Sequence, residues 1–310
     1  MGLHLGFIHQ ILNQYRRDGV RLVFLNCLVP YYKYHAMAAR LLGLPVVWSI
    51  REDVRSKRAR RLLRWLKRFA TLVMPCSGEI ATELRRQGLS VPVRVVHNGI
   101  ATAGEASETS TGLRRELDIP ADHWVVGCVG SIERRKGQLD LATAAGMWPS
   151  GEGPLDIVLL GAPGAKGVAD PYLQELQRSA ALLPEHVKLH LCGARRDVAA
   201  LYGEMDAVCL PTYWEGSSRT ILEAMRARRP LLTTTAGGNP EIVRHLESAY
   251  LVSPGDCEAI ARGLLFLKNH SAEAAAFVEA AHLDLNRNHT LAHYTERVGA
   301  VIDDVYKSCL

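Results

Sequence analysis

Short apolar segments alternate with helically patterned segments along most of this 310-residue chain. Each apolar segment has the length of a buried strand, and the segment after it carries apolar residues at helical spacing. This alternation predicts an α/β protein whose parallel sheets are covered by helices on both faces. The expected strands are 21–27, 46–50, 72–76, 92–97, 124–130, 155–161, 187–191, 207–210, 230–234 and 249–252, and the clearest expected helices are 1–17, 34–42, 80–87, 272–282 and 291–306.

A segment of small and polar residues, 101–112, interrupts the alternation and has nothing apolar to bury. Such a composition is typical of a connection between domains. The charge balance changes sign at the same place: residues 1–100 carry 17 Lys and Arg against 5 Asp and Glu, and residues 101–310 carry 20 against 27. We therefore expect a basic domain at 1–104 with an anionic partner, an acidic domain at 105–285, and a C-terminal helix, 286–310, that packs back on the first domain.

Composition excludes several classes of protein. A hydrophobic content of 48% and a charged content of 22% are globular values and exclude a mainly disordered chain. No apolar run approaches the roughly 20 residues that a membrane-spanning helix needs, and the N-terminus has no basic leader typical of a secretory signal. The seven cysteines include no CxxC pair, which favours a reducing cytoplasm.

The loop after the expected strand 207–210 is the first candidate for chemistry, because ligands of open parallel sheets bind beyond the carboxyl ends of strands. It carries Glu215, Gly216, Ser217 and Ser218, and a helix with Glu223 follows. Serines at a helix start leave free N–H groups at its positive end, which suits a diphosphate. Alternatively, this is a surface loop with a capped helix, in which Glu223 pairs with a neighbouring arginine.

Two further loops fit the same edge. After strand 124–130 come Ser131 and a basic turn, Arg134, Arg135 and Lys136, whose cations could hold a departing diphosphate. After strand 230–234, a Gly-Gly pair and a proline lie at 237–240. The alternatives are a solvated basic turn in the first case and turn chemistry alone in the second.

Taken together, the motifs HNG at 97–99, VGSIERRKG, LLGAPG, EGSSRTILEAM and GGNPEIV resemble those of the retaining GT-B glycosyltransferases, family 4. The resemblance covers roughly 94–256 and, more loosely, 22–88. It implies two Rossmann-like domains with parallel sheets, a first domain that lacks its usual opening strand and glycine-rich loop, and transfer of a sugar from a nucleotide-diphosphate sugar with retention of configuration.

The resemblance also implies roles for single residues. Glu215 matches the glutamate that faces the donor sugar, Glu223 the one that binds the ribose hydroxyls, and Lys136 the lysine that neutralises the donor diphosphate. Ser131 stands where the family usually has arginine, so Arg134 or Arg135 must substitute, and Arg135 joins the expected catalytic residues. The other expected donor-site positions are Ser131, Arg134, Gly193, Ala194, Gly216, Ser217, Ser218, Asn98 and Gly99.

The expected partners follow from this resemblance. They are a nucleotide-diphosphate sugar, with UDP favoured as the nucleotide, and a glycan or lipid-linked acceptor; no metal, cofactor or nucleic acid is expected. The alternative function is a catalytically impaired nucleotide-binding module or a partner subunit of a glycosyltransferase, in which activity is lost with the missing opening segment.

A basic stretch, 55–69, carries eight Lys and Arg in fifteen residues and places Leu62, Trp65, Leu66 and Phe69 on one helical face. A basic amphipathic helix with an aromatic anchor suits an anionic membrane surface. Alternatively, the same apolar face covers the sheet of the first domain. The expected membrane-surface residues are Arg58, Arg61, Arg64, Trp65, Lys67 and Arg68, which would make a cytoplasmic protein peripheral on the inner face of the membrane.

Overall fold

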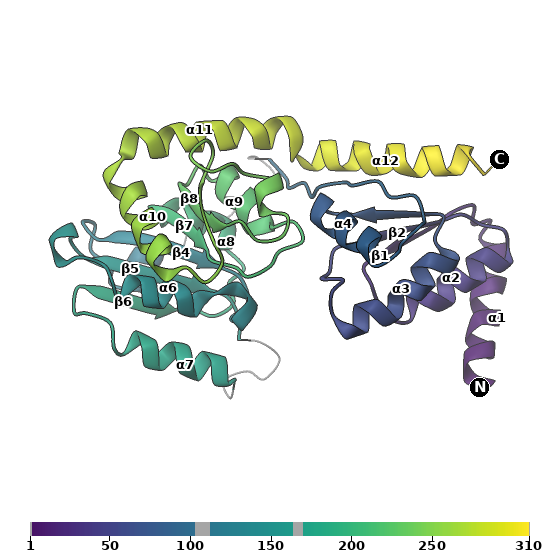
Figure 1. The fold of residues 1–310 in the computed structure, drawn as a ribbon, viewed down its shortest axis with the longest axis horizontal. Helices are drawn as coiled ribbons and strands as arrows, with labels where there is room; N and C mark the ends of the chain where they lie inside the picture. The colour runs from purple at the N-terminus through teal and green to yellow at the C-terminus, as the bar shows by residue number, and fades with distance from the viewer. Residues whose placement is uncertain (1, 103–111, 164–169, 310) are drawn as a thin grey trace. The chain divides into compact units, whose positions relative to one another are not determined.

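The computed structural model describes residues 2–102, 112–163 and 170–309, apart from the side chains of residues 2–5 and 58 (Figure 1). The chain forms two compact units. Unit 1 comprises residues 1–98 and 292–310, and unit 2 comprises residues 99–291. Most of the expected connection at 101–112 lies outside the described residues.

Unit 1 is a three-stranded parallel sheet with helices around it. Strand β2, buried along its whole length, lies between β1 and β3. Val301 and Val305 of the last helix pack against Val47, Met74 and Val96. The elements are α1 (Gly2–Arg17), β1 (Val23–Asn26), α2 (Tyr32–Leu41), β2 (Val46–Ile50), α3 (Lys57–Phe69), β3 (Leu72–Pro75), α4 (Gly78–Arg86) and α12 (Leu291–Lys307).

The strand expected at 92–97 is wrong. This segment runs beside β3: Val73 N donates to Pro92 O, and Arg94 N and Val96 N donate to Val73 O and Pro75 O, but the two segments form a single isolated bridge, Val73 with Val93. The next bond of a parallel ladder would come from the N–H of residue 75, which is proline and has none. The segment is therefore extended without being a strand of the sheet.

Unit 2 is a six-stranded parallel sheet in the order β6-β5-β4-β7-β8-β9. Its first strand is central, two strands follow on one side and three on the other, which is the order of a doubly wound Rossmann-like fold. The order reverses between β4 and β7, so the ligand crevice of such a sheet belongs at their carboxyl ends. The strands are β4 (Trp124–Val129), β5 (Leu155–Leu160), β6 (Val187–Leu191), β7 (Ala207–Leu210), β8 (Leu231–Thr234) and β9 (Tyr250–Val252).

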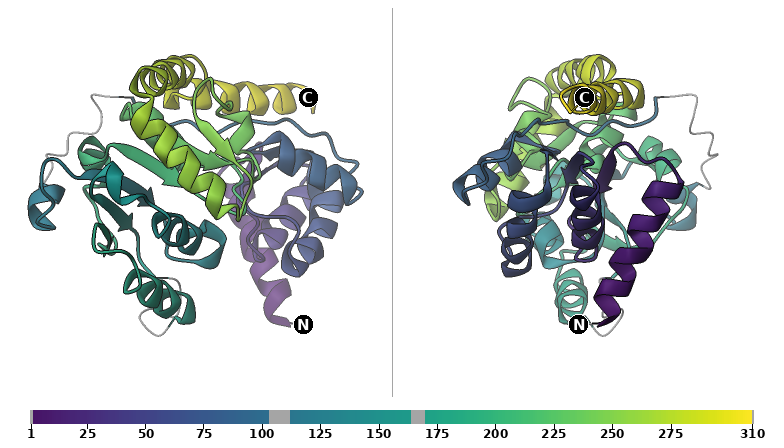
Figure 2. Two further views of the ribbon diagram at one scale, coloured as in Figure 1. Left: turned by 60° about the vertical axis from the view of Figure 1, so that its left-hand side comes forward. Right: turned by 90° about the vertical axis from the view of Figure 1, so that its right-hand side faces the viewer.

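Helices cover both faces of this sheet (Figure 1 and Figure 2). Leu141, Leu176 and Ile260, from α6, α7 and α10, bury one face, and Leu201 and Ile221, from α8 and α9, bury the other. This arrangement confirms the predicted α/β class and nine of the ten expected strands. The elements are α5 (Leu113–Glu116), η1 (Arg134–Lys136), α6 (Gln138–Ala145), η2 (Ser150–Glu152), α7 (Pro171–Ala180), α8 (Val198–Leu201), η4 (Tyr202–Glu204), α9 (Arg219–Arg226), η5 (Asn239–Glu241), α10 (Cys257–Asn269) and α11 (Ser271–Asn288).

Candidate active site

The loops after β4 and β7 meet at the point where the strand order of unit 2 reverses. Tyr213 N and the Thr212 hydroxyl both donate to the carbonyl oxygen of Arg135, at 2.8 and 2.9 Å. Gly137 has a φ of +70°, and a Cβ there would overlap the carbonyl oxygen of Pro211. Only glycine allows this backbone conformation and this close approach without strain. The two loops are therefore joined into one rigid site.

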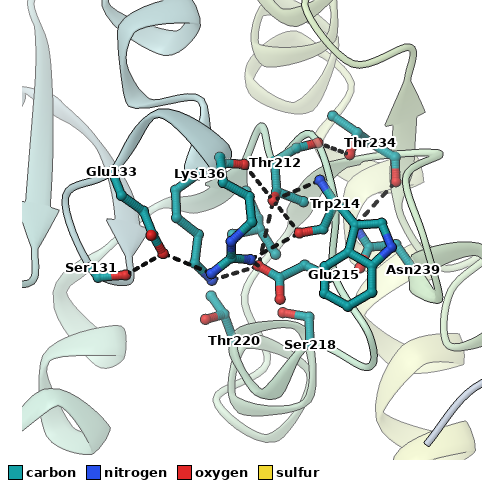
Figure 3. A network of polar contacts seen from close by, with 12 residues as sticks. Ser131, Glu133, Lys136, Thr212, Trp214, Glu215, Ser218, Thr220, Thr234 and Asn239 are labelled. Atoms are coloured by element: carbon teal, nitrogen blue, oxygen red, sulfur yellow. Dashed lines mark hydrogen bonds and ion pairs between the residues drawn. The ribbon is translucent and has the colours of Figure 1, made fainter. Parts of the chain in front are cut away.

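Glu215 is the centre of this site (Figure 3). Lys136 Nζ lies 2.5 Å from Glu215 Oε1, and both side chains are 12% exposed. Arg135 Nη1 lies 3.3 Å from the same oxygen, and the Thr212 hydroxyl lies 3.4 Å from it. Among the described residues, all three side-chain contacts therefore go to Oε1, which leaves Oε2 available to a ligand hydroxyl.

The two arginines of the basic turn η1 contact different parts of unit 2. Arg135 joins the Glu215 cluster and also pairs with Glu133 at 2.7 Å, and Glu133 in turn accepts a hydrogen bond from the Ser131 hydroxyl. Arg134 instead pairs with Glu175 on α7 and lies over the ring of Tyr172. Of the two arginines proposed to substitute at position 131, Arg135 is thus the one that reaches Glu215.

The Gly-Gly loop after β8 supports the backbone of Glu215. Gly238 N donates to the carbonyl oxygen of Glu215 at 2.9 Å. Gly237 has a φ of +57°, and a Cβ there would overlap that same oxygen. Asn239, fully buried, donates to Thr233 Oγ1 and Thr234 O, which anchors the loop to the end of β8 (Figure 3). The described contacts of this loop thus hold the backbone of the Glu215 loop in place.

The start of α9 lies beside Glu215. Ser218 is the N-cap residue of the helix, and Thr220 Oγ1 donates to the carbonyl oxygen of Val129, the last residue of β4. This bond fixes the helix start over the end of β4, and Figure 3 shows Ser218 next to the Glu215 side chain. Gly216 and Ser217 complete the loop. The positive end of α9 therefore adds to the two cations around Glu215.

Glu223 lies one turn further along α9 than the residues at the helix start. Its Oε2 accepts a hydrogen bond of 3.0 Å from the Tyr202 hydroxyl, and its Oε1 lies 3.4 Å from Arg219. Tyr202 was not among the residues expected from the sequence, because 21 positions separate it from Glu223 and no local pattern links the two.

The loops after β5 and β6 continue the same edge of the sheet. Gly161 N donates to the carbonyl oxygen of Gly193, which has a φ of +65°, and Ala194 follows it at an exposed position. Arg195 pairs with Asp197 and Glu116, which raise the pKa of its guanidinium. The negative charges of these two carboxylates balance its positive charge. Gly193 and Ala194 therefore present mainly backbone groups.

The two remaining expected positions fall on different units. Asn98 belongs to unit 1, where its Oδ1 accepts a hydrogen bond of 2.7 Å from Arg51. Gly99 is the first residue of unit 2. Arg51 also donates to the Tyr294 hydroxyl on α12.

On α3, the apolar face is shared between the core and the surface. Leu62 and Leu66 are buried in unit 1, whereas Trp65 and Phe69 are half-buried and stacked, with ring centroids 5.6 Å apart. Arg61, Arg64, Lys67 and Arg68 are exposed, and the side chain of Arg58 lies outside the described residues.

Neither a metal centre nor a membrane span is found in the part of the chain that the structure describes. There, no group of three or more His, Cys, Asp and Glu residues is arranged to hold a metal ion. No described helix is both long and apolar enough to cross a membrane.

The two-unit architecture is that of the GT-B glycosyltransferases. The structure of Anabaena HepE in complex with UDP superposes with a TM-score of 0.83 at 21% identity, over 96% of this chain and 82% of that one. Sucrose-phosphate synthase of Thermosynechococcus elongatus superposes with a TM-score of 0.78 at 20% identity, over 97% and 78%. At this level of identity the likeness establishes the fold.

Sequence comparison defines the family. The profile described as Glycosyl transferases group 1 matches residues 110–284, more than half of the chain, and the profile described as Glycosyltransferase Family 4 matches residues 1–103. The chain belongs to the glycosyl transferases group 1 family, as its motifs indicated.

Curated relatives include D-inositol 3-phosphate glycosyltransferases. That of Salinispora tropica is 32% identical over 184 residues, which are 56% of this chain and 38% of the relative. That of Salinispora arenicola is 28% identical over 225 residues, 69% of this chain and 49% of the relative. The chain thus spans less than half the length of these relatives.

Proposed function

We propose that this protein transfers a sugar from a nucleotide-diphosphate sugar to a hydroxyl group of a glycan or lipid-linked acceptor, with retention of configuration. The observation that carries the proposal is the convergence of Lys136 and Arg135 on Glu215 beside the positive end of α9. In this proposal unit 2 binds the donor and unit 1 provides the acceptor side.

The chemistry proposed for this cluster is electrostatic. When the bond between the anomeric carbon and the diphosphate breaks, negative charge develops on the diphosphate and positive charge on the sugar ring. Lys136, Arg135 and the N–H groups of Ser217 and Ser218 stabilise the diphosphate, and the available oxygen of Glu215 orients the sugar. Because cations and helix N–H groups supply the stabilisation, this scheme requires no metal ion.

The nucleotide is assigned to neighbouring loops. Glu223 binds the ribose hydroxyls, and backbone groups of Gly193 and Ala194 hold the base. UDP is the favoured nucleotide, and the structural neighbour from Anabaena is described in complexes with UDP and with UDP-glucose.

A screen of nucleotide sugars with the full chain tests the proposal. UDP-, GDP-, ADP- and dTDP-sugars are incubated with and without candidate acceptors, and nucleotide release is measured. We expect release that depends on one nucleotide class and a product whose anomeric proton has the same configuration as the donor. An inverted product overturns retention, and no release from any donor overturns the enzymatic proposal.

The alternative function is a nucleotide-binding module without turnover. It differs from the enzyme in one measurable way: calorimetry would detect UDP binding by a chain that releases no nucleotide from any donor. Binding together with release favours the enzyme.

We also propose that α3 attaches the protein to an anionic membrane surface. The supporting observation is a groove of about 540 Å³ beside α3, lined by Met37, Arg40, Leu41, Trp65, Arg68 and Phe69. Apolar and aromatic side chains next to arginines suit the boundary between acyl chains and acidic headgroups. Since Leu62 and Leu66 are buried in the core, the attachment rests on charge and on this aromatic rim rather than on the whole apolar face.

A further inference from the structure

Tyr202 has a hydroxyl group that its surroundings do not require. The residue is fully buried within an apolar cluster that includes Leu201, Val208 and Ile221. Phenylalanine would fill the same space, and a buried hydroxyl costs free energy unless it is hydrogen-bonded. Packing alone therefore does not account for a tyrosine at this position.

Its partner is the carboxylate of Glu223. The Tyr202 hydroxyl donates to Glu223 Oε2 at 3.0 Å, across from η4 to α9. Burial, and after it the negative charge of Glu223, raises the pKa of Tyr202 far above its ordinary value. The phenol therefore stays protonated and acts as a hydrogen-bond donor at every physiological pH.

The turn that carries Tyr202 is itself held in place. Glu204, at the end of η4, accepts a hydrogen bond of 2.9 Å from Arg114 N, and Arg229 Nη1 donates to the carbonyl oxygen of Met205 at 3.1 Å. A donor on a rigid turn inside the core fixes the position of the oxygen that it contacts.

The second oxygen of Glu223 is in a different environment. Glu223 Oε1 lies 3.4 Å from Arg219, whose side chain is 74% exposed, and such an exposed pair contributes little. One carboxylate oxygen is thus anchored from the core, while the other contacts an exposed arginine. The bond from Tyr202 therefore contributes more than the pair with Arg219 to the orientation of the carboxylate.

We propose that Tyr202 is a positioning residue for the nucleotide: through Glu223 Oε2 it orients the carboxylate that binds the ribose hydroxyls. This inference rests on the proposed function, which assigns the ribose to Glu223. It adds a residue that does not touch the nucleotide and predicts how its loss changes recognition of the ribose.

The test compares UDP with its 2′,3′-dideoxy analogue, using calorimetry on the full chain and on Tyr202→Phe. We expect wild type to bind UDP more tightly than the analogue, and Tyr202→Phe to bind UDP about tenfold more weakly with no comparable loss for the analogue. In Glu223→Gln, adding Tyr202→Phe should cause little further change, because both substitutions act on one interaction. Tyr250→Phe, which removes another hydroxyl of unit 2 from a residue that packs against the hydrophobic cluster on the other face of the sheet from α9, is the matched control and should bind both ligands as wild type does.

Three other outcomes of these measurements would contradict the positioning role of Tyr202. A Tyr202→Phe variant that melts at a lower temperature but keeps the wild-type preference for UDP over the analogue overturns the positioning role and makes the hydroxyl structural. A wild-type chain that binds UDP without distinguishing the analogue also overturns it, while the proposed transfer stands. A wild-type chain that binds no nucleotide overturns the proposed function and this inference with it.

Discussion

Lys136 and Glu215 are 79 positions apart in the chain, yet Lys136 Nζ lies 2.5 Å from Glu215 Oε1. Both side chains are largely shielded from water, so the interaction is weakly screened. The proposed function assigns the ammonium group to the diphosphate and the carboxylate to the sugar. Their contact therefore links stabilisation of the leaving group directly to orientation of the group being transferred.

Glu215→Gln should lower turnover by several hundredfold, because loss of a preorganised stabiliser of developing charge costs about 3–4 kcal/mol. The Michaelis constant for the donor should change much less, since the amide keeps the shape of the side chain. Steady-state kinetics against donor concentration measures both values. Glu247→Gln, an exposed glutamate of unit 2, is the control, and near-normal turnover in Glu215→Gln would contradict the role.

Lys136→Met should weaken UDP binding and also lower turnover by about a hundredfold or more, since the substitution removes a cation from the diphosphate site. It should also destabilise the fold, because it leaves the Glu215 carboxylate without its nearest partner. Adding Glu215→Gln should recover part of that stability, which thermal unfolding measures. Lys188→Met, at an exposed position on β6, is the control. If Lys136→Met binds UDP as wild type does, the assignment of Lys136 to the anion site is wrong.

Gly237→Ala should reduce activity although residue 237 has no assigned contact with substrate. The new Cβ would overlap the carbonyl oxygen of Glu215, and φ is +57° there, so the loop must move. We expect a loss of stability on the order of 2–4 kcal/mol and a lower turnover number. Gly151→Ala, where a Cβ meets open space, should change neither value. Wild-type kinetics in Gly237→Ala would show that the loop does not position Glu215.

Strands such as β4 and β7 were predictable because a strand buried on both faces is a continuous apolar run. The loops of the site were predictable for a related reason, since ligand loops follow such strands in this kind of sheet. The failure at 92–97 has a cause in another strand: Pro75 cannot donate the bond that would continue the ladder. A pattern read along one segment does not contain that information.

Directions of side chains were less accessible from the sequence. Arg134 and Arg135 are adjacent in a 3-10 turn, where successive side chains point about 120° apart, so one reaches Glu215 and the other reaches α7. The contact of Gly237 with Glu215 and that of Tyr202 with Glu223 join separate segments through the packing of the sheet. On α3, the helical spacing placed Leu66 and Trp65 together, but only packing decides which of them is buried.

Reversing three charges on α3, in Arg61→Glu/Arg64→Glu/Arg68→Glu, should reduce binding to anionic vesicles by roughly a hundredfold or more, at about 1 kcal/mol for each cation near the surface. Sedimentation with phosphatidylglycerol vesicles measures the binding, and it should weaken in high salt. The matched control reverses three exposed arginines of unit 2, in Arg178→Glu/Arg244→Glu/Arg262→Glu. Equal binding by the two triple variants would exclude α3 as the attachment surface.

The carboxyl group of Asp156 makes the stability of the fold depend on pH. It is buried on β5 and accepts hydrogen bonds from His123 Nδ1 at 2.7 Å and His190 Nε2 at 2.5 Å. Burial raises the pKa of Asp156, but the two histidines outweigh it, so the pKa lies below its ordinary value. The folded state therefore prefers the carboxylate, and the resulting stability is present above pH 4 and is lost as the pH falls through the lowered pKa.

Asp156→Asn should remove this dependence. The free energy of unfolding of wild type should fall more steeply below about pH 4 than that of the variant, by up to about 1.4 kcal/mol per pH unit. Urea unfolding at a series of pH values from 2 to 7 measures the two slopes. Asp122→Asn, an exposed carboxyl near the same strands, serves as the control and should keep the wild-type slope. Asp156→Asn should also lose stability at neutral pH, so the two proteins are compared by the slope of the free energy of unfolding against pH. Equal slopes below about pH 4 would show that protonation of Asp156 does not contribute to acid unfolding.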